Sequence, residues 1–223
     1  MRRTANLADL ACLPFVVVWL ADGFWKQRLE HVAVPLFWAV DFVEWLVLPA
    51  VSLALLHRLA PISRRDYGLA WPGARRFAAE LFLCTVTLFV ANFFGGQMLG
   101  PMLFGYPRDA FDLARTLASY KPLAIIGTFY LAASAGVCES LFALALPWLW
   151  FSQGESVSRG GKAAFALASS FIFALAHWET GWANATGAFA FQLVAVAWYL
   201  RFGGLWPIIG AHFLIDLYWF WPQ

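Results

Sequence analysis

Long apolar runs alternate with short polar connections along the chain. Seven of these runs predict membrane-spanning helices, and they cover residues 8–25, 32–56, 77–99, 122–151, 162–178, 184–200 and 204–222. A helix needs about 20 mostly apolar residues to cross the hydrocarbon core of a bilayer. The runs are too long and too uniformly apolar for the alternating strands of a membrane barrel, so backbone groups in lipid must be satisfied within helices. The pattern therefore predicts an all-α, polytopic transmembrane bundle of about seven spans.

The overall composition supports the same fold class. Hydrophobic residues make up 62% of the 223, charged residues make up 13%, and the mean hydropathy is +0.68. A soluble domain of this size could not cover so much apolar surface. The runs leave no room for a soluble domain, so we expect one integral-membrane domain over residues 1–223. The net charge of +2 gives no reason to expect a nucleic-acid partner.

Basic residues predict the orientation in the membrane, because short cytoplasmic loops carry the excess of lysine and arginine. With the N-terminus in the cytoplasm, ten of the 15 basic residues lie in inner segments and five in outer loops, where Lys26 falls. The connection 57–76 is then a cytoplasmic loop or surface helix, and the connection 100–121 an amphipathic helix on the outer surface. The run 122–151 spans about 45 Å as a straight helix, so we expect it to tilt, bend near Pro147 or extend beyond the bilayer.

Ionisable side chains inside the apolar runs need an explanation, because an ionised group at mid-membrane costs on the order of 3 kcal/mol. The candidates are Asp41, Glu44, Glu139, His177, His212 and Asp216. His212 and Asp216 are four residues apart and share a helix face, and Phe173 lies one turn before His177. Small residues before Glu139 allow another helix to approach closely. We expect Glu139, both histidines and Asp216 to meet in one dry pocket.

That set of side chains supports two kinds of chemistry. In the first, Glu139 is the general base for a water held partly by His177, while His212 and Asp216 stabilise the oxyanion formed on a scissile carbonyl. In the second, Glu139, His177 and His212 bind Zn²⁺ and leave one position open for water. The H-E-x-x-H motif of zinc proteases is absent. Zinc is therefore possible, but no cofactor is required.

Other polar residues in the runs favour supporting roles. Asp41 and Glu44 are three apart on one face, and we expect them to be structural or to support the pocket from outside. We expect Glu179 at the outer interface, where a carboxylate remains solvated, or beside the pocket as a partner of its catalytic residues. Cys138 is more typical of a small buried hydrophobe than of a nucleophile. The three cysteines lack C-x-x-C spacing, which predicts neither a disulfide framework nor a zinc knuckle.

Three stretches together resemble the CPBP intramembrane protease family, which includes the CAAX prenyl endopeptidases and bacteriocin-processing or immunity proteins. They are "FALAHW" (173–178), "YLRFGGLWPIIGAHFLIDL" (199–217) and the loop "RRDYGLAWPG" (64–73). The resemblance implies a membrane-embedded endopeptidase with its core motifs within 122–222. In it a glutamate activates water with the first histidine, and the second histidine with Asn or Asp holds the oxyanion. By this resemblance the residues are Glu139, His177, His212 and Asp216.

The first motif departs from the family pattern. The family usually has E-E-x-x-x-R, whereas this chain has "CESLFA", which aligns Cys138 with the first glutamate, Glu139 with the second and Ala143 with the arginine. Three interpretations stay open. The register can slip by one residue, Glu139 can act from the neighbouring position, or activity can have been lost.

We therefore expect a glutamate-type intramembrane endopeptidase in a bacterial cytoplasmic membrane. Its expected substrate is a membrane-anchored or lipidated protein, cleaved in its C-terminal region. The alternatives are a proton-linked transporter, a non-catalytic immunity or binding protein, and a cysteine protease that pairs Cys138 with His177 or His212.

Overall fold

The computed structural model describes residues 2–32, 34–60, 62–106, 121–152 and 154–221, and these residues form helices and loops without a strand. In chain order the helical segments are α1 (Arg2–Ala21), α2 (Gly23–Val32), α3 (Val34–Phe42), η1 (Val43–Val47), α4 (Leu48–Leu59), α5 (Ala74–Phe93), η2 (Phe94–Leu99), α6 (Gly100–Phe104), α8 (Lys121–Glu139), η3 (Ser140–Ala145), α9 (Leu146–Ser152), α10 (Arg159–Leu175), η4 (Trp178–Thr180), α11 (Trp182–Phe202) and α12 (Trp206–Phe220). The predicted all-α polytopic bundle is confirmed.

Four continuous helical segments are long and apolar enough to cross a membrane. They are Pro35–Leu59, Ala74–Phe104, Ala124–Ser152 and Trp182–Phe202. The central window of Ala124–Ser152 is 72% buried inside the protein, whereas that of Ala74–Phe104 is 11% buried. The first of these two segments therefore lies in the middle of the bundle, and the second lies at its edge with most of its surface left for lipid.

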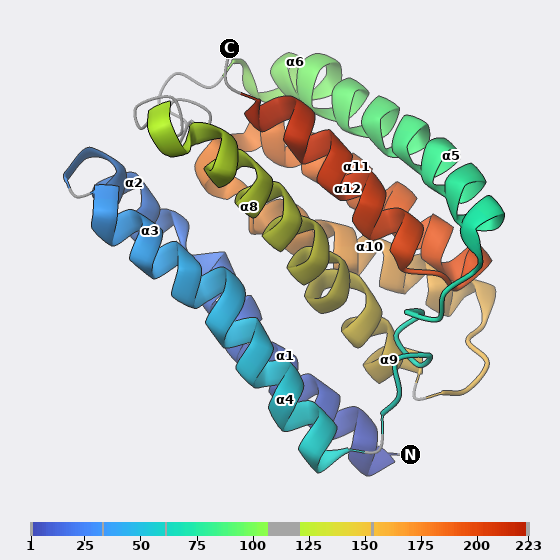
Figure 1. Ribbon diagram of the computed structural model, residues 1–223. Helices are drawn as coiled ribbons and strands as arrows, with labels where there is room; N and C mark the ends of the chain where they lie inside the picture. Colours follow the sequence, from blue (N-terminus) through green and yellow to red (C-terminus); the bar gives the residue numbers. More distant parts are fainter. Residues whose placement is uncertain (1, 33, 61, 107–120, 153, 222–223) are drawn as a thin grey trace.

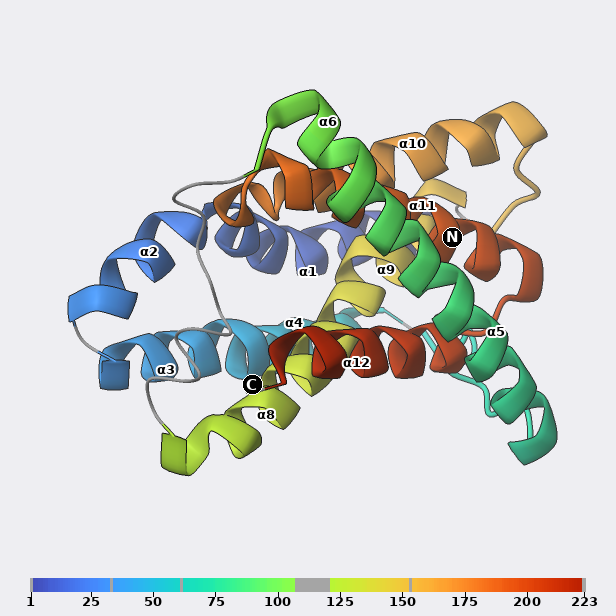
Figure 2. The same ribbon diagram turned by 90° about the horizontal axis from the view of Figure 1, so that it is seen from above.

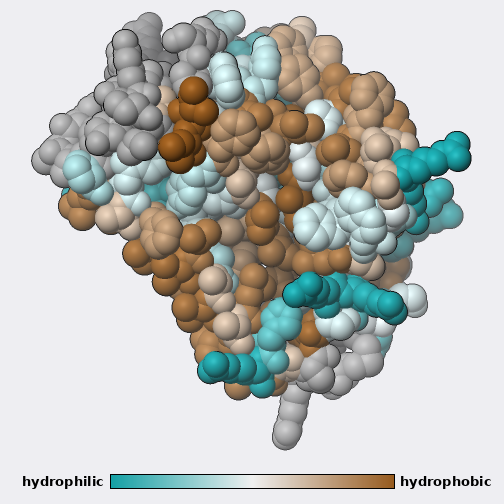
Figure 3. Space-filling model, in the orientation of Figure 1, coloured by the Kyte–Doolittle hydropathy of each residue, from teal (hydrophilic) through white to brown (hydrophobic). Residues whose placement is uncertain are grey.

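The helices pack side by side in a slanted array (Figure 1). α1 packs against α4 and α9, α8 packs against α12, and α12 also packs against α5, while α11 contacts both α10 and α5. Seen from above, α8 and α12 again lie next to each other (Figure 2). Hydrophobic residues cover most of the middle of the face in Figure 3, and hydrophilic residues gather toward its lower and right edges. This distribution suits a chain that lies in a bilayer with polar ends.

Three of the long segments change from α-helix to π-helix just before a proline. The π-segments are η1, η2 and η3, and the prolines are Pro49, Pro101 and Pro147. Proline has no amide hydrogen, so it cannot bond the carbonyl four residues earlier, and the helix must adjust locally. The irregularity expected near Pro147 is therefore a π-segment that ends one residue before α9 begins. It turns the carbonyl of Ala143 toward other helices.

The loop that follows α4 is bonded to the connection between α11 and α12. The Leu205 amide donates to the Gly68 carbonyl at 2.9 Å, and the Trp206 indole donates to the Leu69 carbonyl at 3.0 Å. Gly68 has φ +74°, and a Cβ there would lie 2.4 Å from the Gly203 carbonyl oxygen. Only glycine fits so close an approach in that conformation. The "RRDYGLAWPG" stretch thus holds the start of α12 in place.

Several predicted boundaries differ from the structure. The first run ends as a helix at Ala21, and Asp22 forms the junction to α2. The fifth run ends at Leu175 rather than at residue 178. Of the connection 100–121, residues Gly100–Phe104 form α6, while the predicted surface helix lies largely in 107–120, outside the described residues. The apolar pattern predicted the presence of these helices correctly. Where each helix ends is decided by the turn that follows it.

Candidate active site

A buried triad forms where α8 meets α12. Glu139 is the last residue of α8, and His212 and Asp216 are one turn apart on α12. Nε2 of His212 lies 3.4 Å from Oε2 of Glu139 and 3.4 Å from Oδ2 of Asp216. Glu139 is 5% exposed and His212 is 6% exposed. The predicted meeting of these three side chains is present in the structure, in a site with little water.

A glycine on α8 explains how the two helices come so close. A Cβ added at Gly136 would lie 3.1 Å from the carbonyl oxygen of Ile209 and 3.2 Å from the amide nitrogen of Phe213. This spacing brings the backbones of α8 and α12 nearly into contact, as small residues do at membrane helix interfaces. Glu139 follows one turn later and faces His212 directly.

His177 lies just beyond the end of α10 and is not helical. Its backbone has φ −105° and ψ 18°, and its Nδ1 lies 2.8 Å from the carbonyl oxygen of Phe173. A carbonyl oxygen can only accept, so Nδ1 carries the hydrogen and the neutral ring keeps a lone pair on Nε2. The expectation of a helical histidine was wrong, but the ring is held in one tautomer that leaves an acceptor free.

Aromatic rings connect His177 to the triad. The Phe173 ring lies 4.7 Å from the His177 ring and 6.3 Å from the His212 ring, centroid to centroid. Phe191 lies 4.7 Å from His212, and Trp19 packs edge-on against His177 at 6.0 Å. Phe173 therefore contacts both imidazoles. The apolar rings around them keep the local dielectric low, which strengthens electrostatic interactions inside the site.

The thiol of Cys138 has a partner outside this group. Its Sγ lies 3.2 Å from the carbonyl oxygen of Trp45 in η1. Pro49 lies four residues after Trp45 and cannot donate to that carbonyl, so the thiol takes the place of the missing amide. This geometry gives Cys138 a structural hydrogen bond and does not favour the cysteine-protease alternative.

The zinc set that the sequence offers, Glu139, His177 and His212, is not found among the described residues as a group placed to hold a metal ion. Phe173 contacts the rings of both histidines. The acid–base chemistry of the site can be derived from Glu139, His177 and His212 themselves.

Two polar residues that the sequence did not single out bind near the first motif. The carbonyl oxygen of Ala143 accepts from Ser169 Oγ at 2.8 Å and from Gln192 Nε2 at 3.2 Å. Gln192 also donates to Ser169 Oγ at 2.9 Å. Pro147, four residues after Ala143, was the available signal, since it frees that carbonyl. These bonds tie η3, α10 and α11 together at the position that aligns with the family's arginine.

A second buried polar cluster lies between the N-terminal helices. Lys26 forms an ion pair with Asp22, and its ammonium lies 5.1 Å from the centroid of the Trp45 ring. Burial lowers the pKa of Lys26, but neighbouring carboxylates raise it by more, so the pKa lies above its usual value. The carboxylates that act on it are Asp22, Glu44 and Asp41. Lys26, which the sequence places in an outer connection, lies in the helix α2 with its side chain largely buried. Asp41 and Glu44 are buried as well.

Glu179 lies in the short helix η4 and is buried, so the prediction of a solvated interface residue was wrong. The junction at Gly23 covers it, because a Cβ there would lie 2.7 Å from Cβ of Glu179. Burial and, after it, the nearby charge of Asp22 together raise the pKa of Glu179 to about 8.

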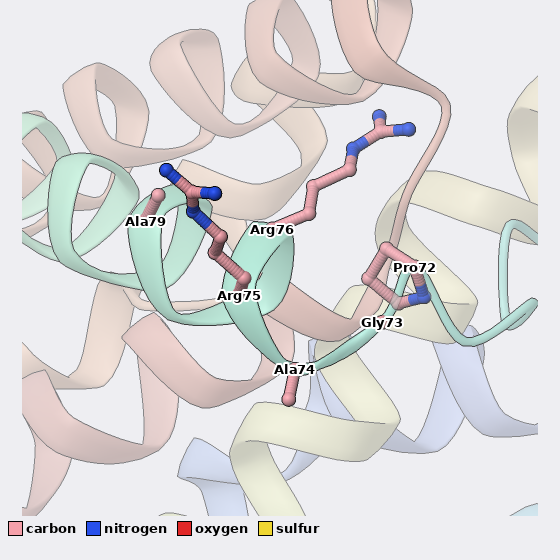
Figure 4. Close-up of a pocket in the computed structure, with 6 residues that line it drawn as sticks. All are labelled: Pro72, Gly73, Ala74, Arg75, Arg76 and Ala79. Atoms are coloured by element: carbon pink, nitrogen blue, oxygen red, sulfur yellow. The ribbon is translucent and has the colours of Figure 1, made fainter.

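An open pocket lies away from these residues, at the start of α5 (Figure 4). Its lining consists of Pro72, Gly73, Ala74, Arg75, Arg76 and Ala79. Arg76 pairs with Glu80 at 2.7 Å, and the side chains of Arg75 and Arg76 extend in different directions from the helix. The pocket holds none of the predicted catalytic residues.

Comparison with known proteins supports the resemblance to CAAX-type proteases. The family model "Type II CAAX prenyl endopeptidase Rce1-like" matches residues 121–218, slightly less than half of the chain. The match contains Glu139, His177, His212 and Asp216. No curated protein and no solved structure matches the chain. The family indicates a protease with a membrane-anchored protein substrate in a lipid environment. With its apolar spanning helices and this match over residues 121–218, the chain is similar to the Rce1-like CAAX endopeptidases of the CPBP family.

Proposed function

We propose that the protein is a glutamate-type intramembrane endopeptidase whose general base is Glu139. One observation carries this proposal: a buried carboxylate of Glu139 lies 3.4 Å from His212, which is in turn 3.4 Å from Asp216. Such an arrangement places a base and a hydrogen-bond donor around one point in a dry site. The His177 ring packs against Phe173, which also contacts His212, and its Nε2 is available to accept from a water.

The reaction can be written with these groups. Water attacks the scissile carbonyl carbon while Glu139 takes one of its protons, and His177 accepts from the same water and orients it. The oxyanion of the tetrahedral intermediate accepts a hydrogen bond from Nε2–H of His212, the group that faces Glu139 and Asp216 in the resting site. The protonated Glu139 then gives its proton to the leaving nitrogen as the C–N bond breaks and the oxyanion re-forms a carbonyl. The remaining proton of the new carboxylic acid passes to the amine, so the products are a carboxylate and an ammonium, and Glu139 is again a carboxylate.

The proposed substrate is a membrane-anchored or lipidated protein, cleaved near its C-terminal end. The family's description supports this class of substrate. α5 lies at the edge of the bundle, and most of its apolar surface is not covered by other helices. A lipid-anchored segment can therefore approach the protein from within the bilayer. We further propose a bacterial cytoplasmic membrane with the N-terminus in the cytoplasm, on the distribution of basic residues.

The test uses purified protein in lipid vesicles and a quenched fluorescent peptide that ends in a farnesylated CAAX sequence. A second peptide with a transmembrane segment in place of the farnesyl group separates the two substrate types. We expect cleavage of at least one peptide by the wild-type protein. Glu139→Gln should lower kcat by at least a hundredfold, because it removes the base but keeps the size of the side chain.

Cys138→Ala is the matched control, because it alters the neighbouring residue of the same motif. We expect it to keep cleavage, since the thiol bonds to the Trp45 carbonyl. Equal cleavage by wild type and Glu139→Gln would contradict the glutamate mechanism. Loss of cleavage in Cys138→Ala alone would favour a cysteine protease. Binding of substrate without cleavage by the wild type would favour the non-catalytic alternative.

A further inference from the structure

We propose that Lys26 is a positioning residue for the active site, although it lies far outside the family match. Together with Asp22, Lys26 holds the α1–α2 junction against two parts of the site. We call them the Glu139 half, which is the turn of α8 that carries Glu139, and the His177 half, which is His177 and the turn that follows it. This inference rests on the proposed protease function and adds a residue to it. No part of the matched motifs contains this lysine.

The burial of Lys26 is the first observation. Its side chain is 12% exposed, and it is the only lysine or arginine among the described side chains that is not classed as exposed to solvent. Taking an ammonium out of water costs several kcal/mol unless a partner compensates it. The partner is Asp22, one turn earlier and itself buried. A charge kept inside a membrane protein at this cost indicates a role.

Contacts of Lys26 lead to the Glu139 half of the site. Its ammonium faces the ring of Trp45 at 5.1 Å from the centroid. The carbonyl of the same Trp45 accepts from Cys138, and Cys138 precedes Glu139 in α8. A cation is attracted to the face of an aromatic ring, and the attraction is stronger where water is excluded. Lys26 therefore fixes η1, and through it the turn of α8 that carries the proposed base.

Contacts of the junction lead to the His177 half. Trp19, at the end of α1, packs edge-on against the His177 ring at 6.0 Å. The Leu20 carbonyl accepts from the Trp178 indole at 3.2 Å. A Cβ at Gly23 would lie 2.7 Å from atoms of both Trp178 and Glu179, so the junction touches the turn after His177 without a gap.

The two sets of contacts meet at the Asp22–Lys26 pair. Asp22 is the single residue between α1 and α2, and the pair closes the turn where the helices change direction. The charges of Lys26 and Asp22 also lie within electrostatic range of Glu139 and His177. The distance between the proposed base and the water-orienting histidine is therefore set by an ion pair from the N-terminal helices. A misplacement of about 1 Å can cost a hundredfold in rate.

The experiment compares Lys26→Met with Lys26→Arg, and Arg28→Met serves as a control on the exposed side of the same helix. Methionine keeps the length of lysine but not its charge, and arginine keeps the charge. The first readout is the split between kcat and KM with the peptide that the wild type cleaves. We expect Lys26→Met to lower kcat tenfold to a hundredfold with KM within about twofold. Lys26→Arg should recover most of kcat, and Arg28→Met should match wild type.

The second readout needs no turnover. The ring ¹⁵N resonances of His177, assigned by their absence in His177→Gln, report its tautomer and surroundings. We expect them to shift in Lys26→Met, to return in Lys26→Arg and to stay unchanged in Arg28→Met. Wild-type resonances together with wild-type kcat in Lys26→Met would overturn the inference. If no peptide is cleaved, the proposed function fails, but the resonances still decide the role of Lys26.

A folding defect is separated from positioning by the thermal midpoint. Lys26→Met with an unchanged midpoint, a lowered kcat and shifted resonances supports positioning. The positioning role is contradicted if Lys26→Met lowers the thermal midpoint, Lys26→Arg does not restore it, and the His177 resonances of the folded protein are those of the wild type. Asp22→Asn provides a second variant of the same pair and should reproduce the effect of Lys26→Met.

Discussion

Individual prolines decide which carbonyl oxygens are available to bond other helices. Pro49 and Pro147 each leave the carbonyl four residues earlier without its usual donor. The Trp45 carbonyl is then taken by the Cys138 thiol, and the Ala143 carbonyl by Ser169 and Gln192. Two gaps in helical bonding thus become links between helices. Both links adjoin the segment that carries Glu139.

Gln192→Leu tests the link at Ala143. The leucine has nearly the same volume but cannot donate to the Ala143 carbonyl or to Ser169 Oγ. We expect a loss of about 1–3 kcal/mol in the free energy of unfolding, because buried acceptors lose a partner. Unfolding in mixed micelles measures it. Asn184→Leu is the control, since Asn184 is exposed at the start of α11 and its side chain bonds the Thr180 carbonyl at the end of η4. An equal loss in both variants would contradict the argument.

At the scale of elements, close approach between helices depends on glycines at particular points. Gly136 brings α8 next to α12, as described above for the triad. Gly100 does the same for α6 and α11, because a Cβ there would lie 2.3 Å from the Ala183 carbonyl oxygen. A backbone atom cannot move aside as a flexible side chain can, so the contact at Gly100 tolerates no side chain, and at Gly136 a side chain would push the two helices apart.

Gly100→Ala should therefore destabilise the contact between α6 and α11. Overpacking of this kind costs about 1–3 kcal/mol, and we expect a lowered thermal midpoint of the purified protein. Gly160→Ala is the matched control, because no atom lies within 4 Å of a Cβ at that position. A midpoint that falls equally in both variants would show that the close approach is not the cause.

At the scale of the whole molecule, the residues around the candidate site come from a larger part of the chain than the segment that the family model matches. The match starts at residue 121, yet Trp19, Lys26 and Trp45 from the N-terminal helices contact the site or its neighbours. The matched segment supplies the proposed chemistry. The N-terminal helices supply one wall and its buried charges.

The proposed orientation belongs to this scale as well. Most basic residues lie in connections on the same side of the predicted spans as the N-terminus. Because cytoplasmic loops carry the excess of lysine and arginine, this distribution predicts a cytoplasmic N-terminus. Alkaline phosphatase, which is active only outside the cytoplasm, should be inactive when fused to the N-terminus and active when fused to the C-terminus. A fluorescent protein that folds only in the cytoplasm should give the opposite pattern at both ends. Activity of phosphatase at the N-terminus would reverse the proposed topology.

Much of the fold and the membership of the site could be predicted from the sequence alone. The length and uniformity of the apolar runs predict the helical bundle, because lipid satisfies no backbone group. The spacing of His212 and Asp216 predicts their shared face, because an α-helix repeats every 3.6 residues. Ionisable residues inside apolar runs identify Glu139 and His177, because such residues are costly there.

Only the tertiary structure decided which of these side chains meet and what surrounds them. The end of α10 at Leu175 takes His177 out of the helix, and Phe173 packs against the rings of both His177 and His212. The burial of Lys26 and Glu179 depends on the junction at Asp22, which brings together residues more than 150 positions apart. The sequence by itself determines periodicity and local breaks such as proline. Contacts between distant segments depend on how the helices pack, and no local pattern contains that information.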